Sequence, residues 1–260
     1  MIYPDRVQSC AVIRTFTTSD EQLSRQLTWL KESWSWLMRS KVLESMPHEQ
    51  TRPTALDVGC GPGMVMELFS PMLEVKGLDI DPAMVHRARE QGLNAFLGDA
   101  SALPFEDGSF DIAYCSFTLL WVKDPQKVIR EMVRVSRRFV VCLAEPDYGG
   151  RISHPKEVAD LDRYLVESMV EEGADPFIGR KLGTMLERAG LEVEMGVHSG
   201  VWSPGQLKNE AKAEWDSIVR SVKERAETDV LEKAKAAWDR SLADGSLFLF
   251  NPVFYAIGRK

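Results

Sequence analysis

A glycine-rich turn between an apolar stretch and a helical stretch constrains the fold of this chain more than any other feature. It reads Leu56-Asp57-Val58-Gly59-Cys60-Gly61-Pro62-Gly63. Its glycines let the backbone turn tightly and let a ligand approach where a Cβ atom would otherwise stand. The amides of such a loop, with the N-terminus of the next helix, favour a carboxylate or phosphate. The turn therefore predicts a strand, a ligand-binding loop and a helix, in that order.

Short apolar stretches alternate with helical ones from Thr54 onwards. The apolar stretches, each an expected strand, are Ala55–Val58, Val75–Ile80, Ala95–Leu97, Phe110–Cys115, Phe139–Leu143, Leu191–Val197 and Val253–Ile257. The helical stretches between the earlier strands are Met64–Met72, Pro82–Gln91 and Pro125–Val135. This alternation predicts an α/β fold, with a doubly wound, mostly parallel sheet and helices on both faces. The last apolar stretch reads as a closing strand of that sheet.

Helical additions flank this alternation at both ends. From Ser19, leucines and a tryptophan recur alternately four and three residues apart, which predicts an amphipathic helix that packs on the core or caps a cofactor cleft. Ser203 and Pro204 signal a second helical region and Gly245 its end, with one helix or two left open. This region either covers the carboxyl edge of the sheet or simply packs on the core, and the sequence leaves both possibilities open. We divide this single domain into an N-terminal extension (1–50), a cofactor-binding core (51–200), a helical insertion or lid (203–245) and a closing strand (247–260).

Composition excludes several other classes of protein. The 260 residues are 44% hydrophobic and 27% charged, which suits one globular domain. The formal charge of −7 argues against a nucleic-acid partner held by its phosphates. The four cysteines form no CxxC pair, and no His/Cys cluster has metal-ligand spacing, so no metal is expected. Without a signal-like start or a membrane-spanning apolar run, we expect a cytoplasmic protein.

An acid at the end of the second strand limits which class of ligand the turn can bind. Asp79 lies twenty residues beyond Gly59, and an acid there can accept hydrogen bonds from both hydroxyls of a ribose. The ligand is therefore expected to contain adenosine. A nicotinamide-binding turn requires a third glycine at the position of Met64, so that fingerprint fails. Asp81, before Pro82, is expected to cap the next helix.

The glycine spacing GxGxG resembles motif I of the class I S-adenosylmethionine-dependent methyltransferases. The resemblance runs from about Thr54 to Leu143, closest to the type 11 small-molecule subgroup of the ubiquinone and menaquinone pathways. Further motifs that carry it are Gly98-Asp99-Ala100, Leu103-Pro104-Phe105, Gly108-Ser109-Phe110-Asp111, Ser116 to Val122 and the terminal Gly258-Arg259-Lys260. That subgroup often has two histidines where this chain has Leu120 and Trp121, so no substrate role carries over from them.

The resemblance implies a Rossmann-like, seven-stranded sheet and S-adenosylmethionine as cofactor, with S-adenosylhomocysteine as product. The loop of Gly59, Gly61 and Gly63 would hold the methionyl part, and Asp57 would fix the loop or the amino group. Asp79 would bind the ribose, Ile80 would pack on the adenine, and Asp99 would accept from its amine. A local backbone cap for Asp57 and ordinary core packing for Ile80 are the alternatives. The other expected cofactor contacts are Cys60, Met84, Gly98, Ala100, Ser116, Phe117 and Trp121.

The resemblance also implies in-line transfer of a methyl group, and its acceptor is expected to be a small molecule. A weakly acidic acceptor needs a general base near the cleft. The segment Ala144–Arg151 follows the fifth strand and is either a substrate wall or a polar turn; Asp147, Tyr148 and the more distant His198 are the catalytic candidates. An RNA or protein methyltransferase and a non-catalytic, cofactor-binding regulator are the alternative functions. Monomer and homodimer both remain open.

Overall fold

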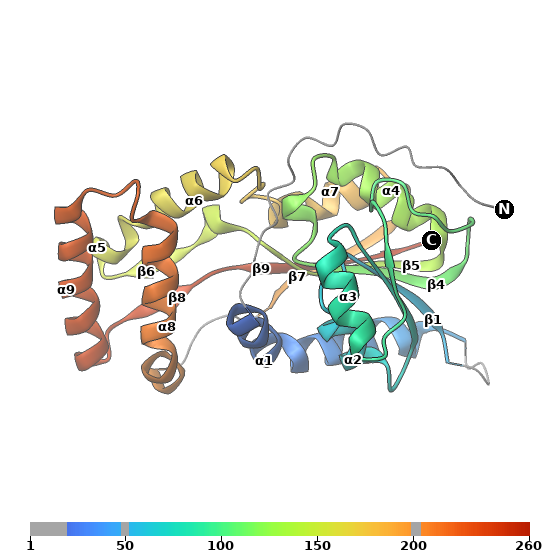
Figure 1. Ribbon diagram of the computed structural model, residues 1–260, viewed down its shortest axis with the longest axis horizontal. Helices are drawn as coiled ribbons and strands as arrows, with labels where there is room; N and C mark the ends of the chain where they lie inside the picture. The colour runs from blue at the N-terminus through green and yellow to red at the C-terminus, as the bar shows by residue number, and fades with distance from the viewer. Residues whose placement is uncertain (1–19, 48–51, 199–203) are drawn as a thin grey trace.

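A seven-stranded sheet organises the computed structural model, which describes residues 20–47, 52–198 and 204–260 (Figure 1). The strands of this sheet are β1 (Thr54–Val58), β2 (Glu74–Asp79), β3 (Ala95–Leu97), β4 (Phe110–Ser116), β5 (Ser136–Pro146), β7 (Glu192–His198) and β9 (Val253–Arg259). Their spatial order is β3-β2-β1-β4-β5-β9-β7. β1 to β5 pair in parallel and β9 runs antiparallel to both of its neighbours. The predicted mostly parallel, Rossmann-like sheet is confirmed.

Helices cover both faces of this sheet because each presents one apolar side to it. One face packs against α4 (Pro125–Val135) and α7 (Leu182–Glu187). The other face packs against α2 (Met64–Phe69) and the N-terminal helical segment, while α3 (Pro82–Glu90) packs beside α2. The sheet is therefore doubly wound.

The N-terminal helix α1 (Asp20–Trp36) continues into a π-helical turn, Leu37–Val42, and a 3-10 turn, Leu43–Ser45. Leu30, Trp34 and Leu37 are almost fully buried against the sheet. Trp34 also meets Phe117 edge to face, at 6.4 Å between ring centroids. The helix therefore packs on the core and also reaches a residue of the expected cofactor cleft. The expected start at Ser19 lies outside the described residues.

A second layer of helices lies beyond the carboxyl ends of the parallel strands, on the left of Figure 1. It consists of α5 (Lys156–Ala159), α6 (Asp162–Glu171), α8 (Pro204–Val222) and α9 (Thr228–Asp244), with a small sheet of β6 (Ile152–His154) and β8 (Phe248–Phe250). These elements share a hydrophobic core of their own, centred on Trp215 and Trp238, whose rings lie 5.3 Å apart. We call this assembly the cap. The division of the chain into extension, core, insertion and closing strand remains a proposal. In the structure α5 and α6, which that division includes in the core segment, pack with the insertion.

Most predicted elements have their expected places, and the differences have simple causes. The predicted helix Met64–Met72 ends at Phe69, because Ser70 and Pro71 begin the turn into β2. The insertion forms two helices, and α9 ends at Gly245 in the left-handed conformation, as its glycine predicted. Asp81 caps α3 by accepting from the Ala83 amide, as predicted.

Candidate cofactor and active site

The glycine turn joins β1 to α2 at the carboxyl edge of the sheet. Gly59, Gly61 and Gly63 all have positive φ, at 75°, 53° and 91°, a conformation that favours glycine. A Cβ atom at Gly59 would lie 2.5 Å from Thr118, whereas one at Gly61 would meet nothing within 4 Å. The backbone is therefore closely packed at Gly59 and open at Gly61, where a ligand can approach it.

Asp79 ends β2 beside this turn. Its Oδ2 accepts from the Gly61 amide at 2.8 Å and its Oδ1 from the Asp81 amide at 2.9 Å. Each oxygen retains acceptor capacity for a hydroxyl of a ligand. Burial raises the pKa of this carboxyl, although the backbone amides oppose the shift. Ile80 next to it is 49% exposed, so it is not ordinary core and offers an apolar surface at the strand end.

Asp57 lies deepest in this edge of the sheet. Its carboxyl is buried on β1, and burial raises its pKa to about 8. The nearby Tyr114 hydroxyl opposes this rise in pKa, and the charge of Asp79 adds to it. Its Oδ2 has no hydrogen-bond partner among the described residues, and neither does the buried Oγ of Ser116. Orphaned buried acceptors are rare unless a ligand or water satisfies them. These two oxygens and the open backbone at Gly61 fit a ligand with an ammonium group, as the methionyl end of S-adenosylmethionine has.

The loop after β4 has a strained backbone. Phe117 has φ of 51°, the one non-glycine residue with positive φ among those described. Such a conformation costs about 1–3 kcal/mol and persists where neighbours enforce it. Here the Phe117 amide donates to the Ala144 carbonyl at 2.7 Å, and the 3-10 turn Leu119–Trp121 follows directly. Of the predicted cofactor contacts, Ser116 ends β4, and Phe117 and Trp121 lie in this loop.

Glu145 anchors the same loop from β5. Its carboxylate is fully buried and accepts from the amides of Thr118 and Leu119, each at 2.9 Å, and of Leu120 at 3.3 Å. Burial raises its pKa to about 7 against the opposing effect of those amides. The sequence predicted that Glu145 belongs either to a substrate wall or to a polar turn, and no local signal showed that it turns inward to the loop.

The other predicted cofactor contacts lie around this edge at different depths. Asp99 follows β3, is exposed, and accepts from the Ser101 amide at 2.7 Å. Cys60 is buried against α2 and α3, and burial raises the pKa of its thiol. A Cβ atom at Gly98 would meet the Leu78 side chain at 2.8 Å. Met84 in α3 and Ala100 after Asp99 are partly exposed. Their contacts with the cofactor remain predictions.

Two catalytic candidates after β5 have structural partners. Asp147 is buried, accepts from the Gly149 amide, and pairs with both Nε and Nη2 of Arg180, at 2.5 and 2.7 Å. Tyr148 follows it, and burial raises the pKa of its hydroxyl, which is therefore protonated at neutral pH. Tyr148 is thus suited to donate a hydrogen bond, and Asp147 holds a turn of the backbone. A catalytic role for either remains a prediction.

His198, the third candidate, ends β7 and is buried. Its Nε2 lies 2.7 Å from the Leu143 carbonyl, and burial lowers the pKa of its ring. The ring is therefore neutral at pH 7 and donates Nε2–H to that carbonyl. Leu143 is the extra residue of a β-bulge, because β5 is one residue longer than β4 and β9 at this point. His198 thus supports the bulge, and its role as a base remains a prediction.

Arg151, directly before β6, links elements of the cap through a contact that sequence reasoning missed. Its side chain is only 7% exposed and lies 3.0 Å from Asp162 of α6 and 3.7 Å from Glu214 of α8. A largely buried arginine between two acids links the two helices that carry them, and the Ser153 hydroxyl also donates to Asp162. The start of β6 is therefore joined to α6 and α8 by charge as well as by apolar packing.

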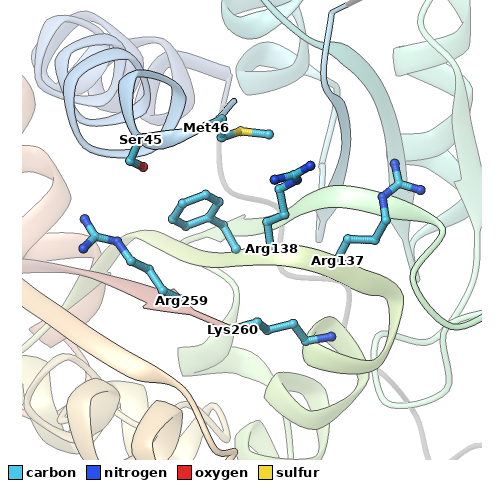
Figure 2. Close-up of a pocket in the computed structure, with 7 residues that line it drawn as sticks. Ser45, Met46, Arg137, Arg138, Arg259 and Lys260 are labelled. Carbon is cyan, nitrogen blue, oxygen red and sulfur yellow. The ribbon is translucent and has the colours of Figure 1, made fainter. Parts of the chain in front are cut away.

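A cavity of about 490 Å³ lies at the opposite edge of the sheet (Figure 2). It is lined by Ser45, Met46, Arg137, Arg138, Phe139, Arg259 and Lys260, from the amino end of β5 and the end of β9. Arg137 is held by Asp111 and Arg259 lies near Glu194. Because ligands of open α/β sheets bind at the carboxyl ends of the strands, this cavity is separate from the candidate site.

Neither a metal site nor a membrane span is found in the described part of the chain. Those residues contain no group of three or more His, Cys, Asp or Glu side chains placed to hold a metal ion. Across residues 20–47, 52–198 and 204–260, no helix combines the length and apolar character needed to cross a bilayer.

Comparison with known proteins agrees with this geometry. Residues 56–142 match the family model described as a methyltransferase domain. Demethylmenaquinone methyltransferase of Bacillus cytotoxicus is 31% identical over 65% of this chain and 78% of its own length. An uncharacterized methyltransferase of Schizosaccharomyces pombe is 33% identical over 54% of this chain. The chain spans 46% and 59% of the first two curated relatives that it matches.

Solved structures show the same fold at low identity. Haemonchus contortus phosphoethanolamine N-methyltransferase 2, solved with S-adenosylhomocysteine, superposes with a TM-score of 0.54 over 96% of this chain and 60% of its own, at 14% identity. The cyclase SpnF superposes with the same TM-score of 0.54 over 95% of this chain and 85% of its own, at 19% identity. The 31% identity to the Bacillus cytotoxicus enzyme, of which this chain covers 78%, and the match to the methyltransferase family model show that the chain belongs to the class I S-adenosylmethionine-dependent methyltransferases, in the type 11 subgroup. S-adenosylmethionine is the cofactor of that family.

Proposed function

We propose that this chain transfers a methyl group in line from S-adenosylmethionine to a small organic acceptor that binds between the cofactor edge and the cap. The observation that carries the proposal is the arrangement of two layers at one edge: the Gly61 turn with Asp57 and Asp79, and the cap beyond the same strand ends. Enclosed, largely apolar sites suit small ligands. The demethylmenaquinone methyltransferase relative supports an acceptor of this size.

The protein's task in this reaction is alignment, because the sulfonium of the cofactor is already activated. Holding acceptor, methyl carbon and sulfur in line contributes about 7–11 kcal/mol in favourable systems. We propose that the Gly59–Gly63 turn and Asp57 hold the methionyl end, and that Asp79 holds the ribose. Ile80 and Asp99 would hold the adenine. The cap would place the acceptor and exclude water.

The proposal is tested by methyl transfer from radiolabelled S-adenosylmethionine. The purified chain is incubated with a panel of small phenols, quinols and amines, and in parallel with bulk tRNA and unfolded protein. We expect label in an organic-extractable small molecule, with S-adenosylhomocysteine formed in equal amount. Label only in tRNA or protein would overturn the small acceptor. If the protein binds the cofactor but methylates none of these acceptors, it would instead be a regulatory module.

A further inference from the structure

One buried carboxylate ties the strained loop after β4 to the end of β5. Glu145 is 0% exposed, yet it contacts no cation among the described residues. Its Oε1 receives the amides of Thr118 and Leu119, and its Oε2 receives that of Leu120. A buried carboxylate normally has a charged partner, so its three amide partners are the feature that needs an explanation.

The β-bulge at Leu143 explains why Glu145 turns inward. The extra residue in β5 shifts the alternation of its side chains, so that Glu145 faces the loop instead of following the regular ladder. His198 donates to the Leu143 carbonyl, which supports the bulge. The position of the carboxylate is therefore set by the fold of β5 and not by the loop that it binds.

The loop in turn touches the glycine turn of the cofactor edge. Thr118 donates through Oγ1 to the Val58 carbonyl at 3.2 Å, and its side chain occupies the space that a Cβ at Gly59 would need. Ser116, whose buried Oγ has no partner among the described residues, precedes the strained Phe117. A loop displaced from Glu145 would therefore disturb both Gly59 and Ser116.

We propose that Glu145 is a positioning residue that holds the 116–121 loop against Gly59 and so shapes the site for the aminobutyrate end of S-adenosylmethionine. The inference rests on the proposed function, because it assigns that end of the cofactor to this loop. Glu145 itself touches no reacting atom. Its effect is on the binding of one part of the cofactor, since the adenosine side is built by β2 and β3.

The test compares two ligands that differ only in the aminobutyrate end. S-adenosylhomocysteine and 5′-methylthioadenosine are titrated calorimetrically into wild type and Glu145→Gln, which replaces one acceptor oxygen by a donor. We expect affinity for S-adenosylhomocysteine to fall about tenfold or more and affinity for 5′-methylthioadenosine to change less than about twofold. The control is Glu131→Gln, because Glu131 also accepts a backbone amide, that of Leu103 at 2.8 Å, outside the site.

The outcomes separate this inference from the proposed function. A wild type that does not bind S-adenosylhomocysteine contradicts the proposed function itself. Wild-type binding with an equal affinity in Glu145→Gln, or an equal loss for both ligands, overturns the positioning role. Amide hydrogen exchange of the wild type decides the case if the variant does not fold: slow exchange at Thr118 and Leu119 is expected, and exchange at unprotected rates would overturn the anchor.

Discussion

Two glycines with positive φ and open surroundings allow the effect of backbone strain on stability to be measured apart from the effect on ligand binding. Gly61 lies at the cofactor edge and Gly92 lies in the turn between α3 and β3, with φ of 53° and 79°. A Cβ atom would meet nothing within 4 Å at either position. The pair therefore differs mainly in whether a ligand approaches the added methyl group.

We expect Gly61→Ala and Gly92→Ala each to lower the free energy of unfolding by about 1 kcal/mol, from the strain of a positive φ. Only Gly61→Ala should weaken binding of S-adenosylmethionine, by about tenfold or more, because its Cβ would occupy the open space through which we propose that the ligand approaches the turn. Urea denaturation and calorimetry measure the two effects. Equal cofactor affinity in both variants would show that the ligand does not approach Gly61.

The buried carboxyl of Asp57 predicts a pH dependence of cofactor binding. Its pKa is raised to about 8 in the free protein, so it is largely protonated at pH 6. The ammonium of the cofactor favours the ionised form, so binding releases a proton and strengthens as pH rises towards 8. We expect the dissociation constant to fall several-fold from pH 6 to pH 7.5, up to about tenfold per pH unit. In Asp57→Asn this slope should be reduced, and an unchanged slope would contradict the assignment.

The raised pKa of Asp57 also predicts how the stability of the fold changes with pH. A carboxyl whose folded pKa lies above its unfolded value stabilises the fold fully at low pH and loses that contribution as pH rises towards 8. Asp57→Asn should therefore be more stable than wild type at pH 7 without ligand, by about 1–3 kcal/mol. Thermal unfolding without cofactor checks this. A less stable variant would mean that Asp57 has a stabilising partner.

At the scale of elements, the cohesion of the cap depends on Arg151. Its guanidinium links the start of β6 to α6 and α8 through Asp162 and Glu214. Removing it leaves Asp162, whose pKa burial already raises, without its cation. The expected cost is set by that uncompensated buried charge and not by the weak energy of a surface ion pair.

We expect Arg151→Ala to lower the free energy of unfolding by about 3 kcal/mol. The matched control, Arg220→Ala on the exposed side of α8, should change it by less than about 0.5 kcal/mol. Chemical denaturation followed by tryptophan fluorescence measures both effects, and Trp215 and Trp238 of the cap are two of the seven tryptophans that contribute to the signal. Similar effects of the two substitutions would show that apolar packing alone holds the cap.

Elements with a strong period could be predicted from the sequence, and short or irregular ones could not. The strands around the glycine turn, α3 with its Asp81 cap and the stop at Gly245 all have local chemical causes. β6 and β8 have three residues each and carry no period of their own. The packing of α5 and α6 with the insertion depends on contacts between distant segments.

The candidate site likewise contains some residues that could be predicted from the sequence and others that could not. Asp57, Asp79 and the glycines were predicted because strand ends and tight turns have recognisable sequences. The strain at Phe117 could not be predicted, because positive φ at an aromatic residue has no sequence signal. Glu145 turns inward through the bulge at Leu143, which contains no glycine to mark it. Arg180 pairs with Asp147 across 33 residues, a contact that only the fold creates.

For the whole molecule, every other assignment depends on one proposal: the carboxyl edge of the sheet binds S-adenosylmethionine. The fold, the family and the orphaned acceptors of Asp57 and Ser116 all support it. The cap and the acceptor matter only if this claim holds. Its test therefore precedes every search for an acceptor.

The measurement is calorimetric titration of the purified protein with S-adenosylmethionine, S-adenosylhomocysteine and NAD in parallel. We predict saturable binding of the first two and none of NAD, with binding lost in Asp79→Ala. Asp124→Ala, which removes the carboxylate that caps α4, should bind as wild type does. Binding of NAD alone, or unchanged affinity for S-adenosylmethionine in Asp79→Ala, would contradict the account.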